Sequence, residues 1–191
     1  MLYIRLFAVM IAIALVVGCS EKREVDTPAA TLFLAASVGD LDRIRSLANK
    51  GNMIDEVDDH GRTPLVHAVM AHQIKAATLL IELGANPRYV TPKGYSLVML
   101  SLYHTKSDAE EMFTSLIKLG LPVNTETPDG DSALNIAVDS HNWKMVKKIV
   151  SLGGCPNGKT VELLNKSAPP PPAGISEHLN SACRQASKQG R

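Results

Sequence analysis

The stretch that decides the fold is DHGRTPLVHAVMAHQIKAATLLIELGANP, residues 59–87. It predicts two helices joined by a tight bend. Thr63 can cap the first helix, and Pro64 suits its first position, where a missing N–H costs little. Apolar residues at helical spacing over 74–83 predict the second helix, and Gly84 ends it as a residue that tolerates a left-handed conformation. Neither helix can bury its apolar face alone, so this unit requires neighbours.

The neighbours appear as two series of glycines that keep the same register. The helix-end series is spaced 33, 36 and 33 residues apart and consists of Gly51, Gly84, Gly120 and Gly153. The turn series is spaced 33 and 36 residues apart and consists of Gly61, Gly94 and Gly130. A period of 33 residues with a Thr-Pro-Leu helix start resembles the ankyrin repeat. The resemblance covers about residues 31–157 and implies an all-α solenoid of about four helix–turn–helix repeats with hairpin-like turns.

The expected organisation follows from these periods and from changes in composition. The predicted segments are a lipoprotein signal peptide at 1–18, a tether at 19–30, an ankyrin-repeat domain at 31–166, a proline-rich linker at 167–174 and a tail with a short helix at 175–191. Within the domain we expect repeats at about 31–60, 61–93, 94–129 and 130–157, and a capping helix at about 160–166.

The leader MLYIRLFAVMIAIALVVGCS carries one cation, Arg5, before a 12-residue apolar run. That run is too short to span a bilayer comfortably and is typical of a secretory signal peptide. It ends in Val16-Val17-Gly18-Cys19, which resembles the lipobox of bacterial lipoproteins. The resemblance implies lipid attached to Cys19 and an outer-membrane location facing the periplasm, since Ser20 rather than aspartate follows. An uncleaved anchor and a plain signal peptide are the alternatives.

Two further cysteines, Cys155 and Cys183, remain once Cys19 is lipidated. An even number of cysteines in an oxidising compartment predicts a disulfide between them. Two free thiols are the alternative. The bond would fold the tail over the last repeat.

The repeats depart from the ankyrin pattern at one position that usually holds histidine. Val66, Met99 and Asn135 stand there, so we expect few polar contacts between repeats and a greater share of apolar stacking. Leu80, Leu116 and Ile149 recur at one helical position and are expected core residues. The third repeat also carries three extra residues within 104–112, as a tolerant loop or as a projecting partner contact.

No motif in the sequence supports catalysis, a metal or a cofactor. His72 and His141 align with Gly39 at the bend between helices, where a positive φ is expected. The histidines lack zinc-binding spacing, and no nucleophile motif or phosphate-binding glycine loop is present. A net charge of +1 gives no basic excess for binding nucleic acid. An enzyme is therefore the disfavoured alternative.

The resemblance implies a monomeric, non-catalytic binding platform whose partners lie against turn tips and inner helices. The corresponding residues are Asp58, Asp59, His60, Arg62, Tyr89, Lys93, Tyr95, Glu126, Asp129 and Asp131. Each is otherwise an ordinary solvated turn residue. The partner would be an envelope protein that is held or protected, or an incoming toxin neutralised by an immunity protein. A structural lipoprotein near the cell wall is a further alternative.

Overall fold

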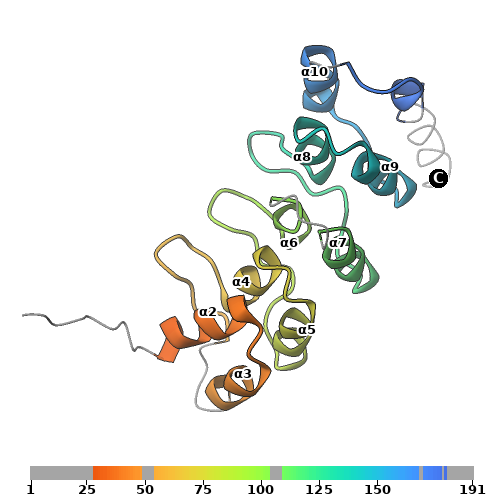
Figure 1. Ribbon diagram of the computed structural model, residues 1–191. Coiled ribbons are helices and arrows are strands. Elements are labelled where there is room, and N and C mark those ends of the chain that lie inside the picture. Colours follow the sequence, from red (N-terminus) through yellow and green to blue (C-terminus); the bar gives the residue numbers. More distant parts are fainter. Residues whose placement is uncertain (1–27, 49–53, 104–108, 168–169, 178, 180–191) are drawn as a thin grey trace, which may run out of the picture.

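The computed structural model of this chain describes residues 28–48, 54–103, 109–167, 170–177 and 179. Its named helices are α2 (Pro28–Val38), α3 (Leu41–Ala48), α4 (Pro64–Met70), α5 (Ile74–Glu82), α6 (Leu97–Leu100), α7 (Ala109–Lys118), α8 (Ala133–Asp139), α9 (Trp143–Ser151) and α10 (Gly158–Lys166). Figure 1 shows these helices in two rows, with α2, α4, α6, α8 and α10 forming the inner row beside the long turn loops. Each inner helix packs against the next one along the stack.

The inner helices of three repeats begin in the same way. Thr63, Ser96 and Ser132 are the N-caps of α4, α6 and α8, and each side chain accepts the backbone N–H three residues on. Serine thus replaces threonine in the third and fourth repeats without loss of the cap. Such a bond satisfies one of the amide groups that a helix start leaves without a partner.

The bends between paired helices use a left-handed residue, as the sequence predicts. His72 has φ 57° and His141 has φ 54°, and Gly39 has φ 78° at the equivalent place. Histidine adopts this region more readily than most side chains do. The prediction of a backbone role for these two histidines is confirmed.

The core is a continuous apolar layer between the two rows of helices. Leu80, Leu116 and Ile149 are 0%, 1% and 0% exposed, which confirms their expected burial. Trp143 is the first residue of α9 and packs partly buried against the core. Regular burial of one face per helix is what a stack of repeats requires.

The C-terminal segment also joins the core. Asn157 caps α10, so this capping helix begins at Gly158, two residues before the predicted start. Ile175 and Leu179 are 1% and 2% exposed and belong to the core cluster. Cys155 lies half-buried just before α10.

Several predictions fall outside the described residues. These are the leader at 1–18, the tether up to residue 27, residues 104–108 of the segment expected to hold the insertion, and Cys183. The lipid anchor, the disulfide and the domain boundaries therefore stay predictions. Among the residues that the structure describes, no helix is both long and apolar enough to cross a membrane.

Candidate functional site

Three turn loops of the stack share one hydrogen-bonded construction. In each loop a side-chain oxygen accepts the backbone N–H four residues further on. The acceptors are Asp58, Thr91 and Thr127, and the donors are Arg62, Tyr95 and Asp131, at 2.8, 3.1 and 3.0 Å. Asp and Thr are residues that commonly fix turns in this way. The construction places Arg62, Tyr95 and Asp131 at equivalent positions in successive repeats.

The turn loops and the inner helices enclose two adjoining hollows. The repeat 3–4 hollow has a volume of about 460 Å³. Its lining comes from the turn loops and from the region of α6, α8 and α10, and comprises Tyr95, Leu102, Tyr103, Asp131, Asn135, Ile136, Asp139, Ser140, Lys159 and Leu163. This hollow is therefore built from the segment that follows α6 and from the next two inner helices, α8 and α10.

The repeat 2–3 hollow has a volume of about 320 Å³. Its lining comprises His60, Arg62, Val66, Met70, Thr91, Pro92, Lys93, Tyr95, Leu100 and Tyr103. Tyr95 and Tyr103 line both hollows, and their rings meet edge to face with centroids 6.0 Å apart. We call the two hollows together the loop-side groove.

The groove gathers half of the residues predicted to bind a partner. His60, Arg62, Lys93, Tyr95 and Asp131 line it. The other five predicted residues, which do not line it, are Asp58, Asp59, Tyr89, Glu126 and Asp129. Partner binding by any of the ten stays a prediction, and the groove identifies those that can act together.

Asp58 has a structural task within its own turn. Besides the Arg62 amide, its carboxylate accepts the His60 amide at 2.9 Å and lies 2.9 Å from Nε2 of His67. Burial would raise the pKa of Asp58, but these contacts outweigh it and hold the pKa below its ordinary value of 3.8. His67 thus points to the preceding turn loop. It therefore cannot take the place of the histidine that the ankyrin pattern usually has at the position of Val66.

Tyr89 also supports the loops. Its hydroxyl donates to the carbonyl oxygen of Gly61 at 2.8 Å, and its ring packs half-buried against the core. This bond joins two successive turns. Substituting Tyr89 would therefore disturb the loops themselves, so it is a poor probe of binding.

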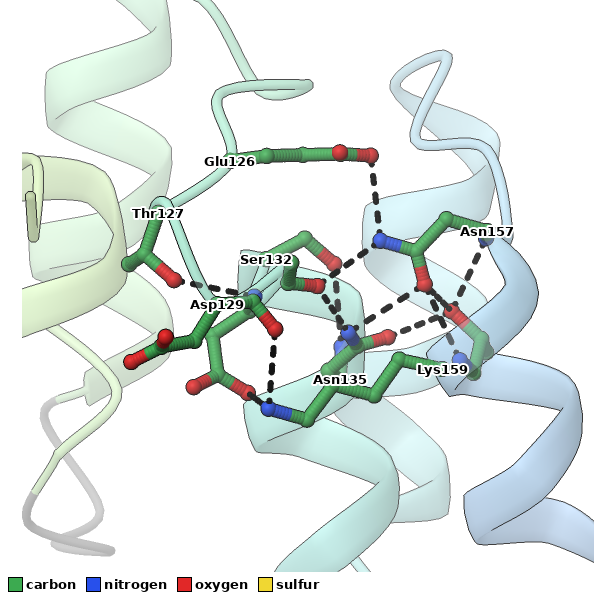
Figure 2. A network of polar contacts seen from close by, with 10 residues as sticks. Glu126, Thr127, Asp129, Ser132, Asn135, Asn157 and Lys159 are labelled. Atoms are coloured by element: carbon green, nitrogen blue, oxygen red, sulfur yellow. Dashed lines mark hydrogen bonds and ion pairs between the residues drawn. The ribbon is translucent and has the colours of Figure 1, made fainter.

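The third of these turn loops, which contains Gly130, is tied to α10 by a polar network centred on Asn135 (Figure 2). The Asn135 side chain donates to the carbonyl oxygen of Gly130 at 2.9 Å and accepts the hydroxyl of Thr160. Asn157 donates to Glu126 and to the same Gly130 oxygen, at 3.0 and 2.9 Å. The expectation of few polar contacts between repeats is therefore wrong at this end of the stack. An asparagine amide both donates and accepts, which lets it take the place of the usual histidine.

Asp131 and Lys159 form an ion pair on the wall of the repeat 3–4 hollow, 2.7 Å apart. The hydrogen bond to Asp131 raises the pKa of Lys159 above 10.5. Burial, followed by the nearby charge of Asp131, raises the pKa of Tyr95 above 10.0. At neutral pH the groove therefore presents a charged ammonium beside a neutral phenol.

Tyr103, Asp139 and Lys159 are among the groove residues that sequence reasoning missed. Tyr103 and Asp139 each lie eight residues after a groove residue of their own turn loop, so the repeat register could have identified them. Lys159 gave no such signal, because its position depends on how α10 stacks on the fourth repeat.

Within the described residues, no cluster of three or more His, Cys, Asp or Glu side chains is arranged to hold a metal ion. His141 bonds Ser167 at 3.2 Å, but its Nδ1 faces the backbone oxygen of Asp139 at 3.0 Å. The groove walls carry one ion pair, further charged side chains, aromatic rings and apolar side chains. Such an arrangement is suited to binding.

Comparison with known proteins agrees with this architecture. The family described as "Ankyrin repeats (3 copies)" matches residues 10–91. Human "Transient receptor potential cation channel subfamily A member 1" is 27% identical over 138 residues, which cover 71% of this chain and 12% of that protein. A "Putative ankyrin repeat protein" of Rickettsia bellii is 33% identical over 90 residues, covering 45% of this chain and 13% of the relative. Another "Putative ankyrin repeat protein", from Rickettsia felis, is 24% identical over 140 residues, which cover 73% of this chain and 48% of that relative. The chain spans less than half the length of each of these relatives.

The family match, these relatives and the two rows of helices together show an all-α ankyrin-repeat solenoid. The match includes the first expected repeat and most of the second, and the structure extends the same pattern to α10. Ankyrin-repeat proteins are generally non-catalytic scaffolds that bind other proteins.

Proposed function

We propose that this chain is a protein-binding platform anchored in a bacterial envelope, where it holds or protects a periplasmic partner. The observation that carries the binding part is the loop-side groove with Tyr95 and Tyr103 at its centre. Tyr103 keeps 54% of its surface exposed although it is a large aromatic side chain. Tyrosines in such positions are common energetic centres of protein interfaces.

The anchoring part of the proposal rests on the leader and on the length of the segment between Cys19 and α2. The apolar run ends at Val16-Val17-Gly18-Cys19, and eight residues separate Cys19 from Pro28 at the start of α2. Eight residues extend at most roughly 30 Å. A lipid on Cys19 would therefore keep the stack close to the membrane surface. The ankyrin match begins at residue 10, inside the expected leader, so lipidation needs a direct measurement.

Replacing Cys19 by serine should abolish lipidation and leave an unprocessed precursor that migrates more slowly. Only the cysteine thiolate can take the diacylglycerol, and cleavage follows that modification. The measurement is metabolic labelling with a palmitate analogue, followed by membrane fractionation. Ser20→Ala is the matched control and should keep its label. Label that persists on the Cys19→Ser protein would contradict the proposed anchor.

The identity of the captured protein would then separate the two uses of such a platform. An envelope enzyme indicates holding or protection, whereas a secreted toxin indicates immunity. Either outcome is consistent with a membrane-held binder, and both depend on the same groove.

A further inference from the structure

The loop-side groove has a repeating layout in which repeats 2, 3 and 4 each contribute one residue from the turn loop and one at or just after the end of the inner helix. The second of these lies eight positions after the first. The pairs are Arg62 with Met70, Tyr95 with Tyr103, and Asp131 with Asp139. All six residues line the hollows. At the turn-loop position the side chain therefore changes from basic to aromatic to acidic along the stack, and at the second position it changes from apolar to aromatic to acidic.

The basic end is the repeat 2–3 hollow. Arg62 and Lys93 line it together with His60, and none of its lining residues is an aspartate or glutamate. Of the neighbouring carboxylates, Asp58 is engaged with His67 and with its own turn amides, and the exposed Asp59 lines neither hollow. No ion pair of the described residues involves Arg62 or Lys93. These two cations are therefore available to an acidic group.

The acidic end is the repeat 3–4 hollow. Its lining carries Asp131 and Asp139 against a single cation, Lys159, which is already paired with Asp131. Asp139 is exposed, and no ion pair among the described residues involves it. The exposed Asp129 lies two positions before Asp131 on the same turn loop. The negative charge at this end therefore exceeds the positive charge.

We infer that the loop-side groove binds an extended segment of its protein partner, with acidic residues over Arg62 and Lys93, an apolar residue on Tyr95 and Tyr103, and basic residues over Asp139 and Asp129. Opposite charges facing one another favour this alignment and disfavour the reverse one. The inference rests on the proposed function, and it adds the chemistry of the segment that the platform recognises.

The repeat spacing sets the length of this segment. Packed helices lie about 8–10 Å apart, so two steps along the stack cover roughly 20 Å. An extended chain advances about 3.3 Å per residue. The acidic and basic residues of the segment should therefore lie about six positions apart, with the apolar residue midway.

A pair of synthetic peptides tests this inference on the full chain in detergent micelles. The first has glutamates at one end, leucine in the middle and arginines at the other end, and serines between them set the spacing derived above. This peptide is made in both chain directions. The second has the same composition with the charges alternating. In fluorescence anisotropy, the better direction of the first peptide should bind at least about tenfold more tightly than the second, and added salt should weaken it.

A charge reversal checks which end binds which charge. Arg62→Glu should weaken binding of the first peptide about tenfold, and a peptide with its glutamates replaced by arginines should restore binding to this variant. Only the backbone of Arg62 takes part in the turn, so the fold should persist. Lys147→Glu, on the exposed side of α9, is the matched control and should change nothing. Asp139→Lys provides the second charge reversal. It should weaken binding of the first peptide, and a peptide whose arginines are replaced by glutamates should restore binding to this variant.

Equal binding of the two peptides, no binding of either, or no restoration by the swapped peptide would overturn the inference. So would an effect of Lys147→Glu as large as that of Arg62→Glu. These results would not contradict the proposed function as long as cross-linking in cells shows that the groove contacts a partner. Loss of that contact as well would remove the proposed function itself.

Discussion

Leu80→Ala should lower the free energy of unfolding by about 2–5 kcal/mol, because it leaves a cavity in a fully buried layer. Leu80 lies on α5 with 0% of its surface exposed and belongs to the continuous core. Each repeat contacts only its neighbours, so the loss should loosen the middle of the stack. Urea unfolding followed by circular dichroism gives the free energy, and amide hydrogen exchange gives its location.

Leu119→Ala is the matched control for this substitution. It removes the same atoms from a leucine that is 51% exposed, just after α7. Its effect should stay within about 0.5 kcal/mol, as for most surface substitutions. An equal loss of stability in the two variants would contradict the assignment of Leu80 to the core.

Asn135→Ala should lower the free energy of unfolding by about 1–3 kcal/mol, because it leaves buried polar partners without their hydrogen bonds. Asn135 is 1% exposed, donates to the Gly130 oxygen and accepts the Thr160 hydroxyl. These bonds join the turn loop that contains Gly130 to α10, so hydrogen exchange should accelerate in α10 before it does in α2. The two measurements together locate the effect.

Asn165→Ala is the corresponding control, since Asn165 is exposed on α10 itself. It should leave both the stability and the exchange of α10 nearly unchanged. If Asn135→Ala behaves like this control, the network of Figure 2 does not hold the last helix in place.

Local signals in the sequence were sufficient to predict the helices, the bends between them and the core positions of the repeats. The helix start at Thr63, the bends at His72 and His141 and the burial of Leu80 all follow from cap chemistry, backbone conformation and spacing. These features depend on residues within a few positions of one another. Repetition at one period then placed them again in later repeats.

The groove could be predicted only in part, because its walls combine residues from different repeats. Arg62, Tyr95 and Asp131 appeared among the turn-tip candidates, but nothing local distinguished them from Tyr89, which supports the loops instead. Lys159 reaches Asp131 across 28 positions of sequence, and that pairing exists only once α10 stacks on α8. The sequence pattern could not predict this pairing, because it depends on how the repeats stack on one another.

The central claim is that the loop-side groove contacts a protein partner, and site-specific photo-cross-linking in living cells tests it most directly. A photoreactive amino acid would replace Tyr103 in the groove or, as the control, Lys147 on the exposed side of α9. Both chains would be full-length and exported by the cells that produce them. We expect a discrete cross-linked protein from position 103 and none from position 147. Cross-linking from position 147 alone, or equally from both positions, would contradict it.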